Sequence, residues 1–260
     1  MDIAERHGGV AGIDLHWRVA GDAPILYLHG VPAAGWHWEP FLARTGGIAP
    51  DLPGFGRSGK PADFDYTIAG YDRFIESFCD ELGLERLTLV MHDWGSVGLA
   101  FAQRLPARVD RLVLTSCVPF VPGYRWHRVA RAWRTRGVGE WVIGATTRGL
   151  LRRYLPRSLA DESWPYFDQG TQRAILRLYR TSPEDRLAEA GAGLGRIDCP
   201  ALVVHGDDDP FVPARFADDY AAALGGRTIV EHVPEAGHWP WHDDPGVVER
   251  VAAFLNVSCA

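Results

Sequence analysis

The chain has 260 residues, of which 47% are hydrophobic and 23% charged, and its formal net charge is −6. That composition is typical of a globular protein, and the net negative charge argues against a nucleic-acid partner. No apolar run approaches the roughly 20 residues that span a membrane, and the first residues lack the apolar core of a signal peptide, so we expect no membrane partner and a cytoplasmic location.

Short apolar runs typical of buried strands alternate with helical stretches along the chain. The expected strands, in order, are GIDLHWRVAG (12–21), ILYLHG (25–30), LTLVMHD (87–93), RLVLTSCV (111–118), ALVVHGD (201–207) and RTIVEHV (227–233). The expected helices include TIAGYDRFIESFCDELG (67–83), VGLAFAQRLP (97–106) and ARFADDYAAALGG (214–226). This alternation predicts an α/β fold, with a mainly parallel central sheet flanked by helices.

The alternation stops near Val118 and resumes near Cys199. The segment between them has helical patterns, many Arg, Trp and Tyr residues and no strand-like run. We therefore predict a helical cap of residues 119–195, inserted into a core formed by residues 1–118 and 196–260. Within the cap, YRWHRVARAWRTRGVGEW (124–141) predicts an amphipathic helix. Its solvated face would carry Arg125, Arg128, Arg131 and Arg134, and its apolar face Trp126, Val129, Ala130 and Trp133.

A sharp turn from strand to helix is expected within LTLVMHDWGSVGLAF (87–101). In a G-x-S-x-G turn of this kind the nucleophile stands at the apex, and here the apex residue is Asp93. Gly95 supplies a small residue where the helix packs back on the strand, and the helix N-terminus favours a carboxylate. An aspartate that merely caps the following helix would fit this stretch equally well. The interpretation therefore depends on the rest of a catalytic set.

The other members of such a set follow in the order nucleophile, acid, histidine. The stretch HGDDDPFVP places Asp209 after a late strand, and EAGHWPW places His238 on a loop after the last strand. Asp207 and Asp208 lie close enough to compete for the role of the acid, but the spacing favours Asp209. Because ligands of such sheets bind at the carboxyl ends of the strands, we predict Asp93, Asp209 and His238 as the catalytic residues.

The stretch LYLHGVPAAGWHW (26–38) predicts an oxyanion hole formed by the backbone N–H groups of Val31 and Trp94. A serine nucleophile is not supported, because Ser96 lies past the apex and Ser58 follows a different strand. We expect no cofactor and no metal ion, since the prolines of HWPWHDDP (238–245) argue against a ligand-bearing helix there. The four scattered cysteines are expected to be free thiols: Cys79, Cys117, Cys199 and Cys259.

An aspartate nucleophile suits displacement at saturated carbon. A carboxylate is ionised at neutral pH and needs no base to activate it. It would form an ester with the substrate carbon, and water deprotonated by His238, itself oriented by Asp209, would hydrolyse that ester. Alkyl halides and epoxides both fit this chemistry. A halide requires N–H donors in an apolar pocket, whereas an epoxide oxygen requires an acidic O–H.

The motifs HGVP, PDLPGFGRSGKP, HDWGS, GDDDPFVP and AGHWPW resemble those of the α/β-hydrolase superfamily over nearly the whole chain, and within it the haloalkane dehalogenase and epoxide hydrolase branch. DLPGFGRSGKP together with HDWGS is closer to the dehalogenases. The resemblance implies Asp93 as nucleophile, Asp209 as acid, His238 as base and the indole N–H of Trp94 as one halide donor. Many dehalogenases have an asparagine where this chain has Val31.

Other dehalogenases complete the halide site with a second tryptophan from the cap, for which Trp133, Trp126 or Trp141 could serve. Epoxide hydrolases instead use two cap tyrosines as acids, and ILRLYRTSP (175–183) resembles the stretch that carries one of them, which implies Tyr179. The partner tyrosine has three candidates: Tyr124, Tyr154 and Tyr166.

We therefore expect a haloalkane dehalogenase-like hydrolase, with an epoxide hydrolase that uses Tyr179 as the alternative. A non-catalytic binding protein of the same fold is the further alternative. The expected partners are a small apolar halogenated or epoxide substrate and water, and the sequence predicts no oligomeric state.

Overall fold

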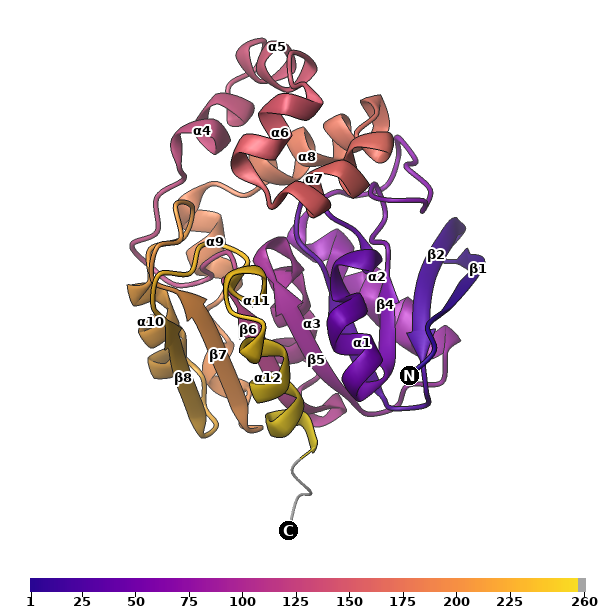
Figure 1. Ribbon diagram of the computed structural model, residues 1–260, viewed down its shortest axis with the longest axis vertical. Helices are drawn as coiled ribbons and strands as arrows, with labels where there is room; N and C mark the ends of the chain where they lie inside the picture. The colour runs from indigo at the N-terminus through magenta and orange to yellow at the C-terminus, as the bar shows by residue number, and fades with distance from the viewer. Residues whose placement is uncertain (257–260) are drawn as a thin grey trace.

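The computed structural model describes residues 1–256, which form a sheet between layers of helices, with a further group of helices at one end (Figure 1). The described strands form one eight-stranded sheet in the order β1-β2-β4-β3-β5-β6-β7-β8. Their bounds are β1 Ala4–Val10, β2 Ile13–Ala20, β3 Ile25–Leu28, β4 Gly47–Pro50, β5 Leu87–His92, β6 Val109–Thr115, β7 Ala201–Gly206 and β8 Thr228–Val233. Strands β4, β3 and β5 to β8 run parallel, whereas β2 is antiparallel to β1 and β4. The predicted α/β fold with a mainly parallel sheet is confirmed.

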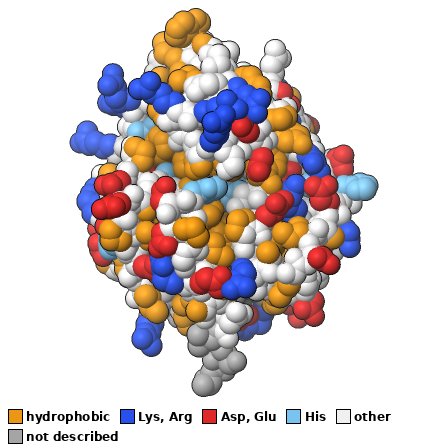
Figure 2. All heavy atoms as spheres, viewed as in Figure 1, with side chains coloured by type: hydrophobic (Ala, Val, Ile, Leu, Met, Phe, Trp, Pro, Cys, Tyr) orange, Lys and Arg blue, Asp and Glu red, His pale blue; other side chains and the backbone are white. Residues whose placement is uncertain are grey.

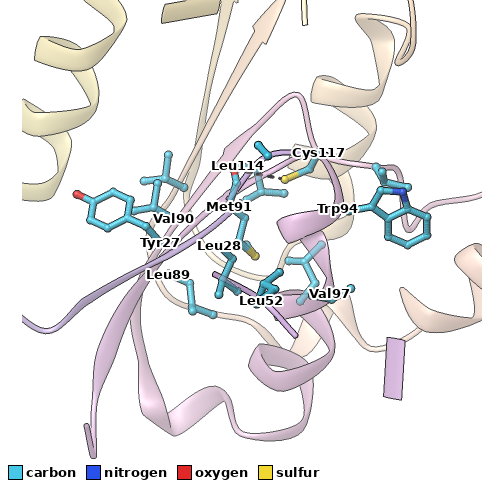
Figure 3. Packing of buried hydrophobic residues seen from close by; sticks show 14 of the residues in the cluster. Tyr27, Leu28, Leu52, Leu89, Val90, Met91, Trp94, Val97, Leu114 and Cys117 are labelled. Carbon is cyan, nitrogen blue, oxygen red and sulfur yellow. Dashed lines mark hydrogen bonds between the residues drawn. The ribbon is translucent and has the colours of Figure 1, made fainter. Parts of the chain in front are cut away.

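The central strands are buried on both faces, which explains why they read as continuous apolar runs in the sequence. Every residue of β3 and β7 is buried, and so are most residues of β5 and β6. Figure 3 shows Leu28, Met91 and Leu114, from three neighbouring strands, with Leu52 and Val97 packed beside them. This core holds the carboxyl ends of β3, β5 and β7 in fixed positions, and the loops that follow these strands and β8 carry the predicted site.

Helices cover both faces of the sheet (Figure 1). Helix α1 (Glu39–Thr45) packs on α12 (Gly246–Asn256), and α2 (Ile68–Glu81) packs on α3 (Gly98–Arg104). Helix α10 (Arg215–Ala223) packs against β7 and β8, and the short α11 (Pro240–Asp243) precedes α12. The three core helices named from the sequence correspond to α2, α3 and α10.

The chain between β6 and β7 forms helices and turns. These helices are α4 (Arg128–Arg134), α5 (Val138–Gly144), α6 (Arg148–Tyr154), α7 (Arg157–Ser163), α8 (Gln169–Thr181) and α9 (Glu184–Ala190). Figure 1 shows α4 to α8 gathered above one end of the sheet, with α5 at the tip of the molecule, while α9 lies closer to the sheet.

The arginine-rich amphipathic helix is shorter than its predicted pattern. Helix α4 begins at Arg128, because the Nδ1 atom of His127 accepts a hydrogen bond from the Ala130 amide at 3.3 Å and thereby caps the helix. Trp126 precedes the helix, and its indole N–H donates to the carbonyl oxygen of Ser182 at 2.9 Å. Placing Trp126 on the apolar face of this helix was therefore wrong: a long-range hydrogen bond, rather than helical periodicity, sets its position.

The described cysteines are unpaired. Cys79, Cys117 and Cys199 are buried free thiols, and Cys259 lies outside the described residues. None of the helices within residues 1–256 combines the length and the apolar character that crossing a bilayer requires.

Candidate active site

Asp93 stands at the apex of the turn that joins β5 to the helical turn Asp93–Val97. Its φ of 49° lies in the left-handed region, a strained conformation for a residue with a side chain. Two glycines make room for it. A Cβ atom on Gly95 would lie 2.1 Å from the carbonyl oxygen of Leu28, and one on Gly30 would lie 2.5 Å from the Cβ atom of Asp93. The turn therefore presents the Asp93 carboxylate at the carboxyl end of β5.

The loop after β3 holds one oxygen of this carboxylate. The backbone N–H of Val31 donates to Oδ2 of Asp93 at 3.0 Å. The other predicted donor, the amide of Trp94, makes no hydrogen bond to this carboxylate within residues 1–256. An N–H aimed at a carboxylate oxygen can stabilise negative charge that builds up there during a reaction. The Val31 amide thus lies where the predicted oxyanion-hole donor would be, whereas the Trp94 amide donates no hydrogen bond to this carboxylate within the described residues.

His238 lies between two carboxylates. Its Nδ1 atom is 2.7 Å from Oδ2 of Asp209, and its Nε2 atom is 3.7 Å from Oδ1 of Asp93. The other oxygen of Asp209 accepts hydrogen bonds from the amides of Phe211 and Val212, at 2.7 and 3.0 Å. Because both oxygens of Asp209 are held, this carboxylate fixes the orientation of the His238 ring. The structure thus brings the three predicted catalytic residues together.

The two carboxylates determine the protonation of His238. Burial alone would lower the pKa of His238, but the charge and hydrogen bond of Asp209, followed by those of Asp93, outweigh burial and raise this pKa. Burial would likewise raise the pKa of Asp209, yet the His238 imidazole lowers it below its ordinary value. His238 therefore carries a proton while Asp93 is charged. Neutralising Asp93 would remove one of the two charges that hold the proton there.

A cavity of about 180 Å³ opens above Asp93 and His238. Most of its lining is apolar, and most of it comes from the helices and connecting loops between β6 and β7, including Trp133, Leu151 and Phe167. Ionisable side chains on its wall are Asp93, Tyr124, His127, Tyr154, Tyr179 and His238. Such a cavity suits a small apolar molecule that reacts at one polar end.

Three buried indole N–H groups around the site have no hydrogen-bond partner in the described part of the chain. They belong to Trp94, which follows Asp93 in the chain, and to Trp133 and Trp239, which line the cavity. Trp239 packs on His238, whereas the rings of Trp94 and Trp133 pack edge-on against Tyr179, at centroid distances of 5.2 and 5.1 Å. Trp126 also stacks on Trp94, but its own N–H is already bonded to Ser182. Buried N–H groups normally have an acceptor, so an unpartnered pair is a candidate anion site.

The other candidates for a halide-binding tryptophan or an acid tyrosine in the cap differ in their positions. Trp141 is 75% exposed and does not line the cavity. Tyr166 accepts a hydrogen bond from Arg57 and packs on Trp36, also away from the cavity lining. Tyr124 lines the cavity, but its hydroxyl donates to the Phe211 carbonyl oxygen at 3.3 Å.

Tyr179 offers a neutral hydroxyl group to the site. Burial, and then the negative charge of Asp93, raise its pKa well above the ordinary value, while the neighbouring indole N–H of Trp94 acts in the opposite direction. The Tyr179 hydroxyl therefore keeps its proton at neutral pH and lies beside the Trp94 indole. It could donate a hydrogen bond to a leaving atom.

His127 also lines the cavity, which its sequence pattern did not indicate. Its Nδ1 atom accepts the Ala130 amide, so the proton of the neutral ring is on Nε2. Burial lowers the pKa of His127 to about 4, against the effect of Asp93, so the ring is neutral at pH 7. The sequence pattern placed His127 inside the predicted helix of residues 124–141, and only the folded chain shows that it caps α4 and lines the cavity.

The residues that could have competed for the roles of acid, histidine and nucleophile have other hydrogen-bond partners. Asp207 lies 2.9 Å from His232, His205 bonds the carbonyl oxygen of Val212, and Ser58 donates to the backbone of Asp51. Within residues 1–256 no cluster of His, Cys, Asp and Glu has an arrangement that could hold a metal ion.

The chain is similar to known proteins over most of its length. The alpha/beta hydrolase fold family matches residues 23–245. A haloalkane dehalogenase of Mesorhizobium japonicum is 30% identical over 264 residues, which cover 90% of this chain and 84% of the relative. Haloalkane dehalogenase 1 of Mycobacterium tuberculosis is 33% identical over 238 residues, which cover 84% and 75%. The crystal structure of haloalkane dehalogenase DbeA from Bradyrhizobium elkani matches with a TM-score of 0.83 and 27% identity, over 98% of each chain.

Proposed function

The chain belongs to the alpha/beta-hydrolase family, in its dehalogenase-like branch, and we propose that this hydrolase releases halide from haloalkanes through an ester on Asp93. One observation carries the proposal. Asp93 and His238 line the same apolar cavity, with Nε2 of His238 3.7 Å from Oδ1 of Asp93 and Nδ1 bonded to Asp209. We assign residues 119–195 as the cap that supplies most of the cavity wall, and residues 1–118 and 196–260 as the core that carries the three catalytic residues.

In the first step, a carboxylate oxygen of Asp93 attacks the carbon that bears the halogen. A carbon–oxygen bond forms, the carbon–halogen bond breaks, and its electron pair leaves with the halide. The hydrogen bond from Val31 at 3.0 Å restrains Oδ2, which leaves Oδ1 as the attacking atom. The unpartnered N–H groups of Trp94 and Trp133 are the proposed donors to the departing halide. An anion accepts such hydrogen bonds more strongly than a carbon-bound halogen does, so they favour the transition state.

In the second step, water attacks the carbonyl carbon of the Asp93 ester. Esterification removes the negative charge of Asp93, so the pKa of His238 falls and the ring, after losing its proton to solvent, becomes a base for that water. Oxyanion charge develops on Oδ2, where the N–H of Val31 already donates. The bond between the carbonyl carbon and the substrate oxygen then breaks, and the alkoxide takes a proton from His238 to leave as an alcohol. The Asp93 carboxylic acid that remains gives its proton to His238, which restores the starting state of both residues. The net products are alcohol, halide and one proton.

A second candidate function, epoxide hydrolysis, is favoured by one specific observation. The neutral Tyr179 hydroxyl lines the cavity beside Trp94 and could protonate an epoxide oxygen as Asp93 attacks. The second acid tyrosine that epoxide hydrolases use has weaker candidates in this cavity. The Tyr124 hydroxyl already donates to the Phe211 carbonyl oxygen, and Tyr154 is 43% exposed.

The two functions separate in a direct assay. Purified protein is incubated with 1-bromobutane, 1-bromohexane or styrene oxide, and bromide release and diol formation are measured. The proposal predicts bromide release that survives in Tyr179→Phe, because indole N–H groups rather than the phenol hold the halide. Diol formation without bromide, abolished in Tyr179→Phe, would replace dehalogenation by epoxide opening. Neither product, with no adduct on Asp93, would indicate a binding protein.

A further inference from the structure

Helices α5 and α6 of the cap expose several large apolar side chains. Val138, Trp141, Leu150 and Tyr154 are 48%, 75%, 39% and 43% exposed, and we call these four side chains the apex patch. Among residues 1–256, the other large hydrophobic residues with comparable exposure are Met1 and Ile229, which lie on the core. Figure 2 shows hydrophobic side chains over α5 at the tip, with Lys and Arg side chains beside them. Apolar patches of this kind, rimmed by charge, mark interaction surfaces.

The chain around the apex patch is strongly basic. Residues 119–160 contain nine arginines and a single acidic residue, Glu140. Arg134 pairs with Glu184, and Arg148 and Arg152 pair with Asp161. The other six are exposed and form no ion pair with the described residues: Arg125, Arg128, Arg131, Arg136, Arg153 and Arg157. Because the whole chain has a formal net charge of −6, its acidic excess lies elsewhere and the molecule is electrically polarised.

The apex patch is continuous with the cavity. Leu150 and Tyr154 belong to the patch and also line the cavity that contains Asp93 and His238. Val142 of α5 lies on the same wall. The exposed side chains of α6 therefore lie at an entrance to the cavity that contains Asp93, and whatever covers them also covers that entrance.

We propose that the apex patch docks on an anionic lipid surface, with Trp141 in the interfacial region and the unpaired arginines against the headgroups. A combination of arginine with tryptophan and aliphatic side chains on one exposed face is what binding at a lipid interface requires. A second copy of the chain fits less well, because two apex patches facing each other would bring unpaired arginines of like sign together. The proposal departs from the expectation of no membrane partner, which rested on the lack of a spanning segment and of a signal-peptide core.

Docking would also deliver substrate. Haloalkanes are apolar and partition into the acyl region of a bilayer, so a cavity that opens at the docked face receives them without passage through water. This second part of the inference rests on the proposed function, whereas the docking itself does not.

The test of docking uses vesicle co-sedimentation of the full chain. Vesicles of phosphatidylcholine alone are compared with vesicles that contain phosphatidylglycerol as a third of their lipid. The wild type is expected to sediment with the anionic vesicles and to be released in 1 M salt, where charges are screened beyond about 3 Å. Arg131→Gln/Arg136→Gln removes two unpaired arginines that do not line the cavity. It should lower the partition coefficient about thirty-fold, since each basic residue near such a surface contributes about fivefold.

A matched control removes two exposed arginines of the core instead. Arg196→Gln/Arg227→Gln should bind anionic vesicles as the wild type does. Equal binding to both kinds of vesicle, no binding to either, or equal losses in the two double variants would overturn the proposal. So would a concentration-dependent dimer in sedimentation velocity that Trp141→Ala abolishes, because the patch would then bind a second copy.

Delivery of substrate from the bilayer to the cavity is tested in a separate assay. Bromide release is measured from 1-bromobutane in buffer and from 1-bromohexadecane held in anionic vesicles. Arg131→Gln/Arg136→Gln should slow release from the vesicle-held substrate at least tenfold and leave the rate with 1-bromobutane unchanged. Equal rates for both substrates in this variant would overturn delivery. Vesicle binding without bromide from either substrate would refute the proposed dehalogenation and leave the docking established.

Discussion

The proposed halide site predicts an unusual separation of activity from stability in Trp133→Phe. The indole N–H of Trp133 is buried and has no acceptor among the described residues, so its removal breaks no hydrogen bond of the resting protein. Phenylalanine keeps an aromatic ring against Tyr179, where the present centroid distance is 5.1 Å. The free energy of unfolding should therefore change by less than about 1 kcal/mol. A hydrogen bond to an anion contributes about 2 kcal/mol, so bromide release should fall roughly thirty-fold.

Trp126→Phe is the matched control. Trp126 lines the same cavity, but its N–H donates to the Ser182 carbonyl oxygen at 2.9 Å. This variant should lose about 1 kcal/mol of unfolding free energy, measured by urea denaturation, while its bromide release stays within about threefold of the wild type. The reasoning is refuted if Trp133→Phe releases bromide at the wild-type rate, or if both variants lose activity and stability in equal measure.

Three further predictions concern the reaction and the fold. In His238→Gln, ester formation on Asp93 should proceed and hydrolysis of the ester should slow at least a hundredfold. One bromide per chain should then be released, and the protein should gain the mass of one alkyl group. Sustained bromide release without a gain in mass would contradict this prediction. Asp51 is fully buried and accepts the amides of Gly35 and Arg57 at 2.7 and 2.9 Å. Burial opposes its charge, but hydrogen bonds, with that of His16 the largest, lower its pKa below the ordinary value of 3.8. The charged carboxylate therefore stabilises the fold above pH 4, and this effect is lost as the pH falls through the lowered pKa. Asp51→Asn should lower the free energy of unfolding by about 3 kcal/mol at pH 7, and the difference from the wild type should narrow toward pH 3. A difference in unfolding free energy that does not change with pH would contradict this prediction. Gly206→Ala would place a Cβ atom 2.1 Å from the Gly237 carbonyl oxygen, so the loop that carries His238 should shift. The variant should have a lower melting temperature and less than a tenth of the wild-type activity. Wild-type melting temperature and activity would show that this contact relaxes freely.

The sequence predicted those parts of the fold whose pattern is local. Strands β5, β6 and β7 are buried on both faces, so their apolar runs were visible. Strand β4 has only the residues Gly47–Pro50, too few for a pattern, and β1 reads AERHGGV, with little apolar character. Both strands exist because β2 pairs with each of them, and the bounds of such elements depend on long-range pairing rather than on their own residues.

In the candidate site too, some residues were predictable from local sequence and others depend on long-range packing. Asp93, Asp209 and His238 each follow a strand, so parallel topology brings them to one edge of the sheet and the sequence could name them. The surroundings of Trp133 were beyond the sequence, because its contact with Tyr179 joins two cap helices that are distant in the chain. The same holds for His127, whose position over the cavity depends on how α4 packs.

The central claim is that Asp93 becomes esterified and that water attacks its carbonyl carbon. A single turnover of wild-type protein with a limiting amount of 1-bromobutane in ¹⁸O-labelled water tests it most directly. Mass spectrometry of the peptide that contains Asp93 should show one heavy oxygen in the carboxylate, while the first 1-butanol formed carries the unlabelled oxygen. An unlabelled Asp93 peptide together with labelled alcohol would mean that water attacks the substrate directly, and would contradict the account.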